Sequence, residues 1–215
     1  MQYLDFLARI SHVLFGITWI GMLYYFNFVQ GEYFKEAEAD AKSDAVKKLA
    51  PRALWWFRWG AMGTFLTGLY LFAKLGSSAN AYIAVGALAG TIMFLNVWMI
   101  IWPAQKIICG IVDGDAGVAA PKAALASRTN VLLSTAMLMG MLGSKHGAIP
   151  NADTHAANAI AGTGMTAGLV IALLAVVLLG LNGIKGKMGP MASVSGVVSC
   201  SIVLAVILLG ILNYL

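Results

Sequence analysis

The stretch from Met191 to Tyr214, MASVSGVVSCSIVLAVILLGILNY, consists of apolar and small residues and contains no Asp, Glu, Lys, Arg or His. A helix needs roughly 20 predominantly apolar residues to cross the hydrocarbon core of a bilayer. This stretch is long enough, and it therefore predicts a membrane-spanning helix.

Similar runs recur along the chain, separated by short polar stretches. Of the 215 residues, 60% are hydrophobic and only 11% are charged, and the mean hydropathy is +0.82. Polar groups are thus too few to cover a water-soluble globule of this size. The pattern predicts an all-α integral membrane bundle of about six transmembrane helices, forming one domain over residues 1–215. The expected helices are 5–30, 53–75, 80–104, 126–144, 156–182 and 191–214.

Lysine and arginine are distributed unevenly between the two ends of this bundle. Of the 14 such residues, 11 fall at the end formed by the first, third and fifth connections, and Arg9, Lys74 and Lys145 fall at the other. The positive-inside rule places the richer end in the cytoplasm. Both termini are therefore expected in the periplasm of a bacterial inner membrane. These flanking residues account for the net charge of +5, and no nucleic-acid partner is expected.

His12 is the sharpest candidate for a functional residue. An ionisable side chain inside a membrane helix is a functional candidate by default, because lipid supplies no partner for it. At about 100° per residue, Gly16 and Trp19 lie on the same stripe of the helix as His12. The stripe combines a ligand, a gap without a side chain and an aromatic wall, against which a flat macrocycle can dock. The alternative is a histidine hydrogen-bonded to a neighbouring helix, with Gly16 allowing close packing.

The two remaining histidines, His146 and His155, flank the fourth connection, at the same end of the bundle as His12. Two neutral imidazoles from different helices can be the axial ligands of a b-type haem. We predict His12 and His146 as this pair, with Arg9 at the same face to bind a propionate. His155 is expected in a solvated loop and is the alternative ligand. A copper or zinc site of three histidines is a second alternative, because neutral imidazole suits both metals.

Other polar groups interrupt the apolar runs toward the cytoplasmic half. They are expected to form hydrogen bonds between helices or to extend toward the membrane surface. Pro103 is expected to end or kink the third helix. The residues concerned are Asn27, Arg58, Asn96, Arg128 and Asn130.

Three segments resemble one known family. HVLFGITWIGMLYYFNFVQ, from His12 to Gln30, is similar to the first helix in the membrane domain of bacterial membrane-bound urate oxidases (urate hydroxylases). NVWMIIWPAQK, from Asn96 to Lys106, and ASRTNVLLS, from Ala126 to Ser134, look like the third- and fourth-helix motifs of that family, in the same order. The resemblance covers roughly residues 5–146.

The resemblance implies oxidation of urate with transfer of electrons to the respiratory chain. In fuller members of the family a c-type cytochrome domain follows the membrane part, and this sequence stops at Leu215 without one. A separate cytochrome c or a larger respiratory complex is therefore the expected partner, with a quinone as a further candidate. The pattern formed by His12, Gly16, Trp19 and Gly21 also looks similar to the first helix of a bacterial haem-dependent protoporphyrinogen oxidase, where a histidine serves haem.

Three functions follow as hypotheses. The first is a membrane-embedded b-type haem protein that passes electrons between a membrane donor and a periplasmic acceptor such as cytochrome c. The second is a cofactor-free structural subunit of a respiratory or oxidase complex. The third is urate oxidation by the chain itself, for which Arg58, Asn96, Arg128 and Asn130 would have to form a purine pocket.

Overall fold

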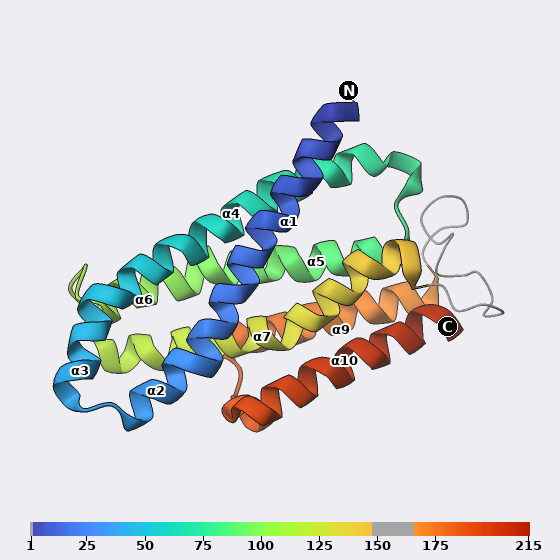
Figure 1. Ribbon diagram of the computed structural model, residues 1–215. Helices are drawn as coiled ribbons and strands as arrows, with labels where there is room; N and C mark the ends of the chain where they lie inside the picture. Colours follow the sequence, from blue (N-terminus) through green and yellow to red (C-terminus); the bar gives the residue numbers. More distant parts are fainter. Residues whose placement is uncertain (1, 148–165) are drawn as a thin grey trace.

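A computed structural model describes residues 2–147 and 166–215, and over these residues the chain is an all-α bundle without strands (Figure 1). The prediction of an all-α membrane bundle is confirmed. The elements are α1 (Gln2–Tyr24), the π-helix η1 (Tyr25–Gln30), α2 (Gly31–Glu36), α3 (Ala39–Asp44), the π-helix η2 (Ala45–Leu49), α4 (Ala50–Leu75), the 3-10 helix η3 (Gly76–Ser78), α5 (Ala81–Asn96), the π-helix η4 (Val97–Ile101), α6 (Trp102–Ile108), α7 (Ala116–His146), α9 (Ala167–Lys185), the 3-10 helix η5 (Gly189–Ala192) and α10 (Val194–Tyr214).

The long helices form two groups. α1 packs along α4, while α7 lies at the centre of the second group and contacts α5, α9 and α10. In Figure 1 the α1–α4 pair is inclined to the other helices and diverges from them toward the N-terminus. The turns after α4 and α7 lie at the same end of the bundle as both chain termini, and the α2–α3 connection lies at the opposite end (Figure 1).

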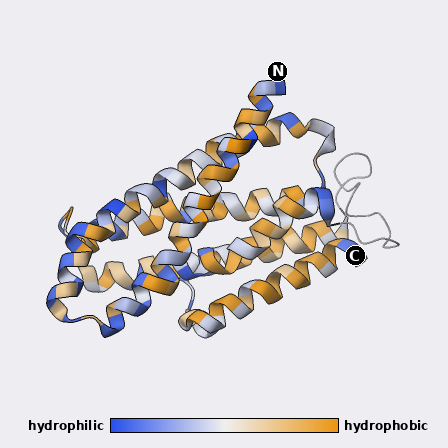
Figure 2. Ribbon diagram, viewed as in Figure 1, coloured by the Kyte–Doolittle hydropathy of each residue, from blue (hydrophilic) through white to orange (hydrophobic). Residues whose placement is uncertain are grey.

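Four of the described helical segments are long and apolar enough to cross a membrane: Gln2–Glu36, Ala81–Ile108, Ala167–Lys185 and Val194–Tyr214. α4 and α7 are also long but less apolar, because Arg58 interrupts α4 and Arg128 and Asn130 interrupt α7. Large apolar side chains such as Leu14, Leu178 and Val206 are more than half exposed on the outside of the bundle. Figure 2 shows this hydrophobic colouring along the long helices, with hydrophilic residues gathered in the α2–α3 connection. An outer surface of this kind is suited to lipid.

Small residues set the closest contacts between helices. A Cβ atom added to Gly140 of α7 would lie 2.5 Å from the backbone nitrogen of Gly86 in α5. A Cβ on Gly168 of α9 would lie 2.7 Å from the carbonyl oxygen of Ile211 in α10. Backbones can approach this closely only where a side chain is missing, which is the usual packing of membrane helices.

Two helix boundaries differ from the sequence prediction. The fourth helix begins at Ala116 instead of near residue 126, because Asp115 caps it by accepting a hydrogen bond from the backbone N–H of Gly117 at 2.8 Å. Pro103 lies in the first turn of α6 and does not end the third helix, which continues to Ile108. The helix changes from α to the wider π form in η4, shortly before this proline. A π-bulge is a known cause of local helix distortion. The predicted start of the fifth helix near residue 156 lies outside the described residues.

Candidate functional site

His12 is held by α4. Its Nδ1 atom lies 3.0 Å from the backbone carbonyl oxygen of Thr64 and 3.1 Å from the hydroxyl oxygen of Thr67. A carbonyl can only accept, so Nδ1 carries the hydrogen and donates it. The Thr67 hydroxyl donates its own hydrogen to the carbonyl of Gly63, at 2.6 Å, which leaves its oxygen free to accept from His12 as well. In a neutral ring, Nε2 then keeps its lone pair.

The glycines that let α1 approach α4 lie on α4. Cβ atoms added to Gly60, Gly63 and Gly68 would meet, respectively, the backbone of Trp19, the ring of Phe15 and the ring of His12. A Cβ on Gly16, by contrast, would meet no atom within 4 Å. The alternative interpretation of this stripe is thus confirmed for His12, which is hydrogen-bonded to a neighbouring helix, and wrong for Gly16, which does not serve close packing. Open space lies beside Gly16, one turn beyond His12.

Trp19 ends the predicted stripe. Its side chain is buried, at 2% exposure, and within the described part of the chain its indole Nε1–H has no hydrogen-bond partner. Buried indole N–H groups usually find a partner. An unpartnered donor two turns from His12 is consistent with a ligand or water beside this stripe. Arg9, the predicted propionate partner, lies on the turn before His12.

His146 is the last residue of α7 and is exposed. The Tyr24 hydroxyl contacts the Ser134 hydroxyl at 2.8 Å, which fixes the antiparallel register of α1 against α7. His12 lies 12 residues before Tyr24, and His146 lies 12 residues after Ser134. At 1.5 Å per residue, each histidine is about 18 Å along its own helix from this contact. Because α1 is inclined to α7, this equal offset does not place the two rings side by side. His12 is bound to α4, and the structure gives no contact between the two rings.

A three-histidine metal site lies outside what the structure describes. His155 falls in the segment that is not described, and within residues 2–147 and 166–215 no three His, Cys, Asp or Glu side chains are grouped as metal ligands. The copper or zinc alternative therefore stays a prediction.

A second polar group joins the helices in the other half of the bundle. The Asn96 amide donates to the Asn130 side-chain oxygen at 2.8 Å, and the Asn130 amide donates to the carbonyl of Met93 at 3.0 Å. Both asparagines are buried. Asn27 in η1 donates to the hydroxyl of Ser127 at 2.8 Å. The expected interhelical hydrogen bonds are confirmed.

The two arginines make contacts of a different kind. Arg58 stacks on the ring of Trp102 at 3.9 Å, as expected of an arginine that extends toward the membrane surface. Arg128 lies within the electrostatic reach of Glu32, and in the described residues its buried Nη1 has no hydrogen-bond partner. Asn96 donates to Asn130, and Asn130 donates to the Met93 carbonyl. The purine pocket required for urate oxidation by the chain alone stays a prediction.

Sequence reasoning missed the partners of the candidate residues. Thr64 and Thr67 belong to a helix predicted only from its apolar run, and Ser134, the partner of Tyr24, was not singled out. Thr64 and Thr67 lie three residues apart, on one face of α4. That spacing was the only available signal that two acceptors face the same neighbour.

The structure defines an integral membrane bundle of helices with a histidine fixed inside one of them. Comparison with protein families is more specific: the family described as "Urate oxidase N-terminal" matches residues 69–205, which is more than half of the chain. The chain belongs to this family. The matched region contains Asn96, Arg128, Asn130 and His146 and begins after α1, so it does not include His12. Searches of curated proteins and of solved structures found no match.

Proposed function

We propose that this protein is a membrane-embedded b-type haem protein of the bacterial inner membrane, related to the membrane part of urate oxidases. In this proposal it passes electrons between a membrane donor and a periplasmic acceptor such as cytochrome c. His12 is one axial ligand and His146 is the other.

The observation that carries the proposal is the hydrogen bond from His12 Nδ1 to the Thr64 carbonyl. Ligating histidines almost always donate their other ring N–H to a carbonyl or carboxylate, which fixes the tautomer and the orientation of the ring. His12 has this arrangement, and Gly16 leaves room beside it. These two observations support His12 as a haem ligand.

The position of His146 is compatible with the second ligand. It ends a helix of a different group from that of His12, and a haem held between two axial ligands requires the ligand-bearing helices to stand apart. The divergence of α1 from α7 toward this end of the bundle meets that requirement (Figure 1). Arg9, one turn before His12, would pair with a propionate at the membrane surface.

Haem supplies a one-electron couple, and the protein sets its potential through the axial ligands, burial and nearby charge. With haem bound, Thr64 and Thr67 would orient His12, and Trp19 would offer an apolar wall with one N–H donor. The exposed apolar face of α1 would lie in lipid.

The test is a reduced-minus-oxidised visible spectrum with pyridine-haem quantitation on the purified protein, for the wild type, His12→Ala and His146→Ala. The expected result is a b-type signal near one haem per chain that is lost in His12→Ala and lost or shifted to a high-spin form in His146→Ala. A wild type that stays colourless after haem supplementation would overturn the proposal and favour copper or the structural subunit.

A matched pair of glycine variants tests the position of the haem. A Cβ atom added to Gly16 or to Gly21 would meet nothing within 4 Å, but Gly21 lies about 180° around the helix from His12. Gly16→Leu should lower haem content severalfold while Gly21→Leu should retain it, as measured by pyridine-haem per chain. Equal haem content in the two variants would place the haem elsewhere.

Urate oxidation is a second candidate, favoured by the family match over residues 69–205. Its test is anaerobic addition of urate to the oxidised protein, followed by the haem absorbance. Reduction by urate that is absent in Arg128→Gln, with haem content unchanged, would support a urate site in the matched region. No reduction by urate would leave electron transfer from another donor as the function.

A further inference from the structure

A half-open cavity of about 510 Å³ lies at the end of the bundle where most of the lysine and arginine gathers. One wall is the amphipathic segment 39–47, which contributes Lys42, Val46 and Lys47. The other wall is the end of α6 and the residues after it, with Ile107, Ile108 and Cys109. The cavity thus combines an apolar floor with two ammonium groups, and among the described residues no carboxylate lines it.

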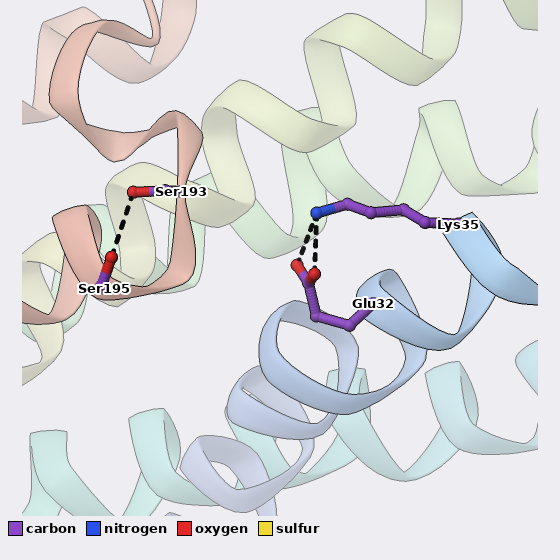
Figure 3. A network of polar contacts seen from close by, with 4 residues as sticks. All are labelled: Glu32, Lys35, Ser193 and Ser195. Atoms are coloured by element: carbon purple, nitrogen blue, oxygen red, sulfur yellow. Dashed lines mark hydrogen bonds and ion pairs between the residues drawn. The ribbon is translucent and has the colours of Figure 1, made fainter.

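The two lysines of the cavity differ from their neighbours on this connection. Lys35 binds Glu32 at 2.8 Å, as Figure 3 shows beside the separate contact of Ser193 with Ser195, and Lys48 binds Asp44. Among the described residues, Lys42 and Lys47 form no salt bridge with a carboxylate, and Lys42 instead lies over the ring of Phe34 at 5.9 Å. Their charge is therefore available to an external anion.

The position of the cavity along the membrane span indicates which kind of anion it would bind. Ile108 is the last residue of the membrane-spanning segment Ala81–Ile108, so the cavity lies where a span meets the surface of the bilayer. Lipid phosphates lie at this level, and the acyl chains begin directly beneath them. Basic pockets on the cytoplasmic side of helix bundles attract anionic headgroups.

We propose that this cavity binds an anionic phospholipid, with the phosphate between Lys42 and Lys47 and the upper acyl chain on Val46, Ile107 and Ile108. A free phosphate ion would use the lysines but gain nothing from the apolar floor. The site is separate from the histidines and does not depend on the proposed haem.

Cys109 provides a reporter inside the cavity. In a Cys200→Ala background it is the sole cysteine, and the protein is placed in nanodiscs of phosphatidylcholine with or without phosphatidylglycerol. Burial raises the pKa of the Cys109 thiol, so all rates of alkylation by neutral N-ethylmaleimide are compared at one alkaline pH. Phosphatidylglycerol should slow alkylation severalfold, and Lys42→Gln with Lys47→Gln should abolish this protection. Lys185→Gln with Lys187→Gln, at the same end but outside the cavity, should retain it.

Equal alkylation rates in the two lipids, or equal protection in the two double variants, would overturn the proposal. Protection by inorganic phosphate alone in phosphatidylcholine nanodiscs would also overturn it and would identify the site as one for a free anion. Native mass spectrometry provides a readout independent of the thiol. Retention of phosphatidylglycerol by the wild type and its loss from the Lys42→Gln, Lys47→Gln variant would support the lipid site, and equal retention by both would contradict it.

Discussion

At the scale of single residues, the hydrogen-bond partners of His12 determine which ring nitrogen carries the hydrogen, and its position in an apolar run does not. The Thr64 carbonyl accepts from Nδ1 in any tautomer that forms the bond, so the backbone of α4 selects which nitrogen stays free. Thr67 adds a second acceptor at 3.1 Å from the same nitrogen. Two residues of α4 thus fix the tautomer and the orientation of a histidine on α1.

Thr67→Val is expected to weaken haem binding by about tenfold, because loss of an outer-shell partner typically costs 10–100-fold in affinity and the Thr64 carbonyl remains. Thr91→Val is the matched control, since Thr91 donates to the carbonyl of Ala87 on its own helix, at 2.8 Å. Titration of haem into the apoprotein, followed by absorbance, measures both affinities. Equal affinities would show that Thr67 has no role in orienting His12.

Asn96 and Asn130 form a buried side-chain hydrogen bond between α5 and α7. A double-mutant cycle of Asn96→Ala and Asn130→Ala is expected to give a coupling energy of about 0.6 kcal/mol and at most about 1.7 kcal/mol, the average and the maximum found for such bonds in a membrane protein. The free energy of unfolding in mixed detergent micelles is the quantity to measure. Additive single effects would mean that the Asn96–Asn130 hydrogen bond adds nothing to stability.

At the scale of helices, the contact of α5 with α7 depends on two missing side chains. Gly140→Ala would place a Cβ 2.5 Å from the Gly86 nitrogen and 2.6 Å from the Tyr82 carbonyl oxygen. Both neighbours are backbone atoms and can move only if the helices separate. The expected cost is about 1–3 kcal/mol of stability, the usual range for overpacking.

Gly210→Ala is the control for this substitution, because a Cβ on Gly210 of α10 meets nothing within 4 Å. It should leave the protein as stable as the wild type or slightly more so, since alanine favours a helix by up to about 1 kcal/mol over glycine. Thermal unfolding of both variants in detergent makes the comparison. A Gly140→Ala protein as stable as Gly210→Ala would contradict the close α5–α7 contact.

The helical segments follow from the sequence because hydrophobic length is a local property of the chain. The pairing of the helices does not follow from the sequence, because it depends on which small residues face each other. The close approach of α1 to α4 occurs at Gly60, Gly63 and Gly68 of α4. Gly16, whose spacing from His12 suggested packing, faces open space. Asn96 and Asn130 could be recognised as polar residues in apolar runs, but not as partners. The Thr64 and Thr67 acceptors of His12 follow only once α1 and α4 are placed together.

At the scale of the whole molecule, the two groups of helices differ in how they are held. The group around α7 is joined by close contacts at Gly140, Gly168 and Gly183. The α1–α4 pair contacts this group through the Tyr24–Ser134 and Asn27–Ser127 hydrogen bonds. The stacked rings of Phe65 in α4 and Phe94 in α5 add a contact beside Thr64, the partner of His12. The arrangement places the proposed haem ligands on two units that meet at one end and diverge at the other.

The distribution of charge predicts how this molecule sits in the bilayer. The α2–α3 end carries 11 of the 14 lysine and arginine residues, and both chain termini lie at the opposite end (Figure 1). Because positive residues stay on the cytoplasmic side, alkaline phosphatase fused after Leu215 should be active, and green fluorescent protein fused there should be dark. A phosphatase inserted after Glu38, in the α2–α3 connection, should be inactive. The opposite pattern would turn His12 and Arg9 toward the cytoplasm, and a periplasmic electron acceptor could then no longer be the partner of the proposed haem.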